Sequence, residues 1–148
     1  METRRFQSKD LNDKNAITDI LKEELALHNE KFDEKAWEEY LRRRDGDLQS
    51  RLGTILAVDG ATVAGFVLTE VRHEMSGVPY GYIHFPAVKR EYKTKVEEML
   101  LLEAIKYLKS LKLKVFRSRI SPSHAMAKSV VMKLHFKQLE LEWQLLEE

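Results

Sequence analysis

The sequence contains no cysteine and only three prolines and six glycines in its 148 residues. Without cysteine there can be no disulfide framework, no thiolate nucleophile and no cysteine-ligated metal. No stretch rich in proline, glycine or serine divides the chain, so we expect a single domain over residues 1–148. No apolar run approaches the ~20 residues that cross a bilayer, and residues 1–7 lack the apolar core of a signal peptide. We therefore expect a cytoplasmic protein with no membrane partner.

An excess of charge of one sign is also missing, because 25 lysines and arginines stand against 24 aspartates and glutamates. The net charge of +1 provides no long-range field that would attract nucleic acid or an anionic membrane. No stripe of interleaved basic and aromatic residues indicates RNA binding either. With 43% apolar and 33% charged residues, the composition is that of a globular protein.

Helical periodicity dominates the first third of the chain, after a short expected strand at residues 3–7. Apolar side chains recur at three- and four-residue steps over 11–29, which predicts a helix with one buried face. Asp33 is placed to cap a second helix, which ends in the arginines at 42–44 before Gly46. We interpret this arginine run as a solvated surface that compensates the helix dipole.

Three runs of β-forming residues follow at 54–58, 62–71 and 80–88. The first two are joined by Asp59-Gly60, which favours the positive φ angles of a type I′ turn and is a strong signal for a β-hairpin. We therefore expect the three runs to be consecutive antiparallel neighbours in one sheet.

The rest of the chain alternates helices and strands. Residues 96–111 are apolar enough for a largely buried helix, and 113–120 should be a strand parallel to 80–88, reached by a right-handed crossover. Ser121-Pro122 would begin another helix, and clean alternation over 137–146 predicts a last strand. The expected fold class is α/β (α+β), with a mixed, mostly antiparallel sheet flanked by helices.

The order of these elements, β-α-α-β-β-β-α-β-α-β, resembles that of the GNAT superfamily of acetyl-CoA-dependent N-acetyltransferases. Residues 64–68 look like the family's third strand. Residues 88–96 lie where the family has a valine and then a glycine-rich loop that opens the long helix. A third motif follows the spacing of the family's Asn–Ala–Leu–Gly–Phe signature, with His124, Ala127, Leu134, His135 and Phe136.

This resemblance implies an acyl-CoA N-acyltransferase fold, with acetyl-CoA as co-substrate and a small-molecule or peptide amine as acceptor. The pyrophosphate would bind at a helix N-terminus, where backbone N–H groups are unpaired. The acyl carbonyl would meet N–H groups on the preceding strand. The resemblance places the cofactor at Ala87, Val88, Lys93, Thr94, Lys95, Val96 and His124.

The loop is degenerate with respect to the family pattern. Val96 and Glu98 stand where the family has small residues, and Val131 stands where it often has a tyrosine that faces the leaving thiolate. Two functions are therefore open from the sequence: an N-acetyltransferase, or a non-catalytic binding or regulatory protein that has lost acetyl-CoA chemistry. A third is a sensor of a phosphate ligand, which would use Lys89, Arg90, Lys93 and Lys95.

His84 is the candidate catalytic residue, because it lies in the strand that would pass beside the acyl thioester. An imidazole titrates near neutral pH and can take the proton of an amine, and Glu70 on the neighbouring strand is the alternative base. The ordinary interpretations are a histidine packed among aromatic residues and a solvated glutamate. No metal site is expected, since His73 and His84 lack ligand spacing and no acidic cluster accompanies them.

The remaining aromatic residues indicate packing or assembly. Trp37 and Tyr40 are expected in the core or at an interface. In the strand predicted at 137–146, Trp143 shares one face with Leu139 and Leu141. An apolar sheet edge without a partner favours pairing with a second copy, so the sequence predicts a homodimer.

Overall fold

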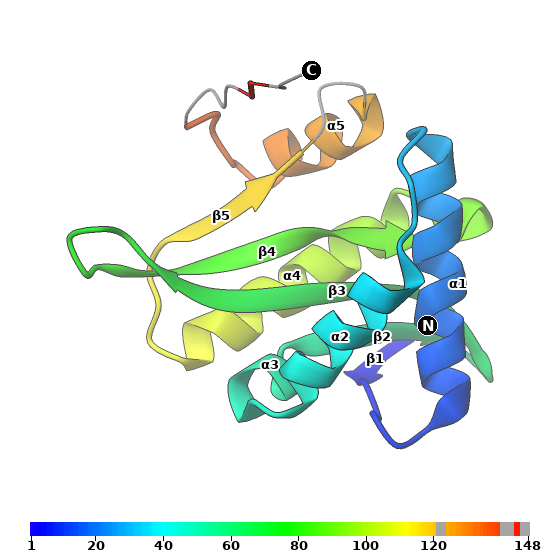
Figure 1. Ribbon diagram of the computed structural model, residues 1–148. Coiled ribbons are helices and arrows are strands. Elements are labelled where there is room, and N and C mark those ends of the chain that lie inside the picture. Colours follow the sequence, from blue (N-terminus) through cyan, green and yellow to red (C-terminus); the bar gives the residue numbers. More distant parts are fainter. Residues whose placement is uncertain (121–123, 140–143, 146–148) are drawn as a thin grey trace.

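The fold is organised around a sheet whose five described strands lie in their order along the chain, β1-β2-β3-β4-β5 (Figure 1). The computed structural model describes residues 1–120, 124–139 and 144–145. The strands are β1 (Glu2–Arg5), β2 (Thr54–Asp59), β3 (Thr62–His73), β4 (Pro79–Val88) and β5 (Phe116–Arg119). β4 and β5 pair in parallel, and the other neighbouring pairs are antiparallel.

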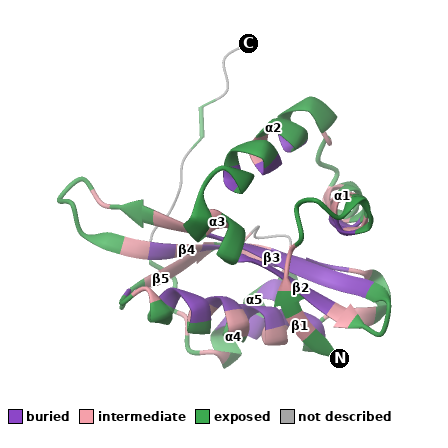
Figure 2. Ribbon diagram, turned by 90° about the horizontal axis from the view of Figure 1, so that it is seen from below, coloured by how far each residue is buried: buried purple, intermediate pink, exposed green. Residues whose placement is uncertain are grey.

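Helices cover both faces of the sheet (Figure 2). On one face lie α1 (Leu11–Leu27), α2 (Glu34–Asp45) and the short α3 (Leu48–Leu52), and α4 (Lys95–Ser110) lies across the other. The 3-10 turn η1 (Arg90–Tyr92) links β4 to α4, and α5 (Ala125–Lys133) adds two valines to the core on the α4 side. No helix within the described residues is long and apolar enough to cross a membrane.

β2 shows how the sequence buries both faces of the sheet. Ile55 and Ala57 pack in the core on the α4 side, whereas Leu56 packs with Trp37 on the α1–α2 side. Successive side chains of a strand point to opposite faces of the sheet. An uninterrupted apolar run therefore suits a strand whose two faces are both covered by helices. α4 lies very close to the sheet, because a Cβ at Gly81 would be 2.6 Å from the nearest side-chain atom of that helix.

The end of β4 departs from regular pairing. Phe66 of β3 pairs with Ala87, but Leu68 pairs with His84, so β4 contains one extra residue in this stretch. The bulge includes Pro86, whose missing N–H would leave a gap in a regular ladder. Pairing with β5 stops at His84. Beyond that residue, one edge of β4 is left uncovered by β5.

Most of the predicted architecture is confirmed. The hairpin, the three consecutive antiparallel strands and the parallel pairing of 80–88 with the following strand are all present. Asp33 caps α2 by accepting a 3.0 Å hydrogen bond from the Ala36 N–H, and α2 ends at Gly46. β5 is shorter than the predicted 113–120, because a turn at 111–112 and an irregular segment at 113–115 follow α4, and the strand ends at Arg119.

One helix was not predicted, and two predictions fall partly or wholly outside the described residues. Helix α3 was not expected, since five residues are too few to show a period. Ser121-Pro122 lies outside the described residues, and α5 begins at Ala125. Half of the strand predicted at 137–146 also lies outside the described residues, and 137–139 and 144–145 are not in a strand.

The prediction of a solvated arginine run was wrong for Arg44, which is 6% exposed. Its guanidinium donates to Thr69 O, Ser50 O and Thr54 Oγ1, each at 2.9 Å. The last β2–β3 pair is Thr54 with Leu68. Arg44 therefore supplies the hydrogen bond that β2 would have given to Thr69 had the strand continued.

Candidate active site

A histidine and a glutamate from adjacent strands form the centre of the candidate active site. His84 of β4 places Nε2 2.9 Å from Oε2 of Glu70 on β3. Leu68 is the direct partner of His84 in the ladder, so Glu70 lies diagonally opposite, two residues along β3. The side chains are 38% and 25% exposed, so the pair is open to a ligand but partly shielded from solvent.

Two further side chains surround the pair. Tyr40 of α2 places its hydroxyl 3.4 Å from Glu70 Oε1 and 3.3 Å from His84 Nε2. Arg72 donates to Glu70 Oε2 at 2.7 Å, and its guanidinium lies 3.6 Å from the centre of the Tyr82 ring. The expectation that Glu70 is a solvated glutamate was therefore wrong, because three neighbours hold its carboxylate.

The electrostatics favour a neutral tyrosine beside an ionised carboxylate. The hydrogen bond from His84, opposed by burial and helped by Arg72, lowers the pKa of Glu70 from 4.5 to about 2. Burial raises the pKa of the Tyr40 hydroxyl. A carboxylate at Nε2 accepts that nitrogen's proton in a hydrogen bond, so Nδ1 carries the lone pair of a neutral imidazole. No described residue forms a hydrogen bond with Nδ1, which leaves this nitrogen available to accept a proton.

The open edge of β4 begins one residue beyond His84. The Lys89 N–H donates to Ala64 O at 2.9 Å, so Lys89 belongs to a hydrogen-bonded position of the β3–β4 ladder. Hydrogen-bonded and non-hydrogen-bonded positions alternate along an antiparallel strand. The Ala87 N–H therefore points to β3, and the Val88 N–H points to the edge that β5 no longer covers. Of the two predicted N–H donors, only Val88 is placed to meet a ligand there.

The N-terminus of α4 is already occupied by a carboxylate of the chain. Glu97 is fully buried, and its Oε1 accepts the Thr94 N–H at 2.8 Å. Thr94 holds the left-handed φ of 73°, at the position where the resemblance expects a glycine-rich loop. The Lys95 N–H is also taken, by Lys93 O at 3.0 Å. The predicted pyrophosphate site therefore contains a negatively charged carboxylate and has few free backbone N–H donors.

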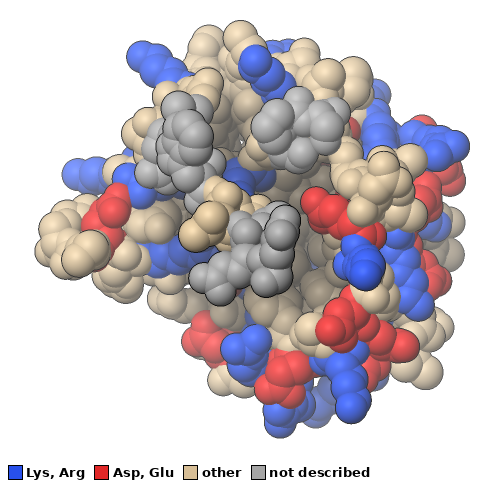
Figure 3. All heavy atoms as spheres, turned by 45° about the horizontal axis from the view of Figure 1, so that its top comes forward, with Lys and Arg blue, Asp and Glu red and all other residues tan. Residues whose placement is uncertain are grey.

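The predicted side-chain ligands are dispersed around this helix terminus. Lys93 makes a 2.5 Å ion pair with Glu24 of α1, whereas Lys95 is exposed. Val96 does not face the loop surface, because its side chain is 3% exposed in the core. On the right of the face in Figure 3, basic and acidic side chains are intermixed. At this helix terminus, Lys93 is therefore opposed by an acidic side chain.

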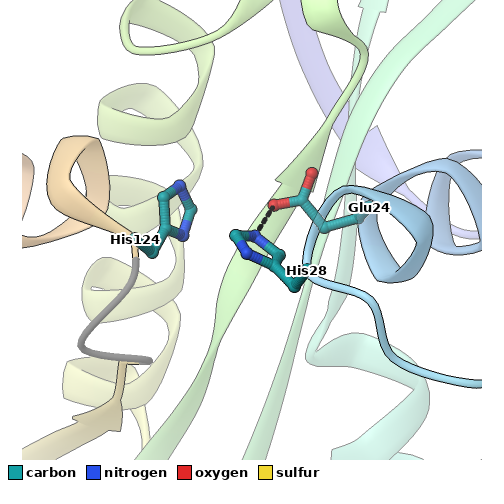
Figure 4. A group of neighbouring side chains, drawn as sticks. All are labelled: Glu24, His28 and His124. Atoms are coloured by element: carbon teal, nitrogen blue, oxygen red, sulfur yellow. Dashed lines mark ion pairs between the residues drawn. The ribbon is translucent and has the colours of Figure 1, made fainter.

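His124 immediately precedes α5, but its side chain makes no capping hydrogen bond. Its ring packs edge-on against Phe85, with 5.3 Å between the ring centres, and lies 4.9 Å from the ring of His28 at the end of α1. Burial lowers its pKa, opposed chiefly by the charge of Glu97. His124 thus joins α5 to α1 across the uncovered end of β4 (Figure 4).

Sequence reasoning missed several residues that meet here. Tyr40 was expected only in the core or at an interface, and Arg72 carried no signal. Glu24 and His28 are four residues apart in one helix, a spacing that puts both on one face. That spacing was a usable signal, but their partner His124 lies far away in the sequence.

Comparison with known proteins supports the fold. No protein-family model and no curated protein matches the sequence. An aminoglycoside antibiotic 6'-N-acetyltransferase from Acinetobacter haemolyticus superimposes with a TM-score of 0.74 at 14% identity, over 100% of this chain and 99% of that one. The NatC complex bound to Gag peptide and CoA contains a chain that matches with a TM-score of 0.78 at 14% identity, over 94% and 86% of the two chains. This chain has the GNAT acyltransferase fold.

An aminoglycoside acetyltransferase from an uncultured soil metagenomic sample, in complex with sisomicin, shares the GNAT fold as well. It matches with a TM-score of 0.71 at 12% identity, over 99% of this chain and 96% of that one. These structures confirm the fold that the order of elements predicted. At such identities they do not define the reaction of this chain, which has to be argued from its own side chains.

Proposed function

We propose that this GNAT-fold chain is an N-acetyltransferase that transfers an acetyl group from acetyl-CoA to an amine. One observation carries the proposal: His84 is held by an ionised glutamate, with Nδ1 free of described partners, one residue before β4 separates from β5. This combination brings a proton acceptor and an open strand edge to one place. General bases of this kind contribute roughly 10²–10⁴-fold to a rate.

In the proposed reaction, Nδ1 of His84 takes a proton from the ammonium group of the acceptor. The free amine attacks the acetyl carbonyl directly, without a covalent enzyme intermediate. The C–S bond then breaks, and the CoA thiolate leaves and takes up the second proton that the nitrogen loses. The Val88 N–H is directed to the edge where the carbonyl oxygen would accept it. Glu70 keeps the imidazole in the tautomer that has a lone pair on Nδ1, and Tyr40 lies against both groups.

The matching structures indicate only the general chemical class of the acceptor. One matching structure contains the aminoglycoside sisomicin, and another contains a peptide and CoA. The proposal is therefore a small-molecule or peptide amine. The cytoplasmic location stays a prediction. The homodimer does too, since half of the strand that suggested assembly lies outside the described residues.

The residues at the α4 N-terminus do not suit the phosphates of acetyl-CoA. The buried Glu97 carboxylate takes the Thr94 N–H, and no small residue exposes the backbone. The charge of Glu97 would oppose any phosphate bound at this helix N-terminus. The same observation favours a second function, a GNAT-fold binding or regulatory protein that does not use acetyl-CoA.

Release of CoA thiol from acetyl-CoA in the presence of aminoglycoside and peptide amines tests the proposal. With an accepted amine, His84→Gln should lower kcat by roughly 10²–10⁴-fold. His73→Gln is the matched control, because His73 is exposed at the far end of β3. Full activity in His84→Gln would refute the role of His84. Absence of acetyl-CoA binding by calorimetry at millimolar ligand would favour the second function.

A further inference from the structure

Two histidines and a glutamate from distant parts of the chain meet beside the α4 N-terminus. Glu24 and His28 come from the end of α1, and His124 comes from the residue before α5 (Figure 4). One possible ligand atom from each lies within 4.8 Å of the other two. The three side chains are 14%, 22% and 14% exposed, so they are shielded but still reachable from solvent.

The distances are close to those of a metal-bound set. Zn²⁺ holds nitrogen and oxygen ligands at about 2.0–2.2 Å, which places tetrahedral neighbours about 3.3 Å apart. Glu24 Oε1 and His28 Nε2 are already 3.6 Å apart. The ligand atom of His124 lies within 4.8 Å of the other two and would have to move closer to complete three ligands. A fourth position would stay open for water.

The surroundings leave a suitable oxygen free for the metal. Lys93 pairs with Glu24 through Oε2 at 2.5 Å, whereas Oε1 faces His28. The ammonium group and the metal can therefore use different oxygens of one carboxylate.

A second and independent observation points to a cation. Glu97 is fully buried, and its Oε2 has no hydrogen-bond partner among the described residues. That oxygen lies 3.9 Å from His124 Nε2, on the side of the cluster next to α4. An unpartnered buried carboxylate oxygen is costly, and a nearby divalent cation would compensate its charge. Glu24, Glu97 and Lys93 together carry a net charge of −1 around the two imidazoles.

We infer that Glu24, His28 and His124 form a binding site for one divalent transition metal ion such as Zn²⁺. Imidazole and carboxylate ligands suit Zn²⁺, Co²⁺ or Ni²⁺, whereas Mg²⁺ and Ca²⁺ prefer oxygen alone. The ion fastens the end of α1 to the start of α5 across the uncovered end of β4. The family resemblance places an anion, the pyrophosphate, in this region. The residues present there favour a cation instead.

Titration of the metal-free 148-residue chain with ZnCl₂ and with CoCl₂ tests this inference. We expect one equivalent to bind, and Co²⁺ to give the intense visible absorption of a four-coordinate site. His28→Gln, His124→Gln and Glu24→Gln should each lower the affinity by about tenfold or more, since even outer partners of metal ligands cost 10–100-fold. Circular dichroism of each variant verifies that it is folded.

The double variant His73→Gln, His135→Gln is the matched control, because both histidines are exposed and outside the cluster. It should bind one equivalent with unchanged affinity. Absence of binding at 100 µM metal, or equal affinity in folded His28→Gln and His124→Gln, would overturn the inference. Binding lost in the control instead would assign the metal to exposed histidines and would overturn it equally. None of these outcomes depends on acetyl transfer.

Discussion

Replacing Glu70 with glutamine should destabilise the protein at neutral pH and have progressively less effect as the pH falls. The pKa of Glu70 is lowered from 4.5 to about 2 in the folded chain. A group whose pKa is depressed by folding contributes stability above its unfolded pKa and loses it as the pH falls through the folded pKa. The carboxylate therefore stabilises the fold fully above about pH 4.5 and hardly at all near pH 2.

The magnitude follows from the size of the shift and the exposure of the pair. A change from 4.5 to about 2 corresponds to about 3 kcal/mol at about 1.4 kcal/mol per unit. Solvent screens this interaction, since the side chains of Glu70 and its partner Arg72 are 25% and 42% exposed. We therefore expect about 1–2 kcal/mol at pH 7, of which about half is lost near pH 3.3.

Urea unfolding of wild type and Glu70→Gln between pH 7 and pH 2.5 measures this difference. The two free energies of unfolding should be about 1–2 kcal/mol apart at pH 7 and should converge below pH 4.5. Glu39→Gln is the control, because Glu39 also pairs with an arginine but on the exposed surface of α2. A Glu70→Gln difference that is absent at pH 7, or constant across this range, would refute the reasoning.

Two further predictions concern buried charges. Arg44→Met should lower the free energy of unfolding by about 2–4 kcal/mol in urea, because Thr69 O loses its hydrogen-bond donor beyond the end of β2. The exposed Arg43→Met should have little effect. Glu97→Gln should tighten CoA binding by roughly tenfold in calorimetry, since a negative charge leaves the helix N-terminus while the acceptor for Thr94 N–H remains. Equal affinity in Glu97→Gln and in the mid-helix control Glu103→Gln would exclude the α4 N-terminus as a phosphate site.

The fold was predictable where the signals are local. Asp59-Gly60 specifies its turn within a few residues, and the apolar period over 96–111 specifies a helix that must be buried. Asp33 and Gly46 mark the two ends of α2. The sequence also carries the order of elements, and that order indicated the GNAT fold without any close relative. Each of these signals is complete within one element or its immediate neighbours.

The candidate site was predictable only in part. His84 and Glu70 could be named because both lie on predicted neighbouring strands. The burial of Arg44 depends on where β2 stops, which no pattern near Arg44 records. Thr94 and Glu97 have the spacing of a capping box, but that spacing does not record that the Glu97 carboxylate is fully buried. The meeting of His28 with His124 depends on how α5 sits relative to α1, so it required the three-dimensional structure.

The strands follow one another in the sheet in the same order as in the sequence, and this order affects how the chain folds. β2, β3 and β4 form a meander from the continuous segment 54–88, so their register can be established through two short loops. Short loops cost little closure entropy, and contacts close in sequence form quickly. His84 and Val88 belong to this early part, whereas His124 can reach α1 only after α4, β5 and the start of α5 have docked. The strands that carry His84 and Val88 can therefore form before α1 and α5 come into contact. An ion bound between these two helices would bind only after the rest of the chain has folded.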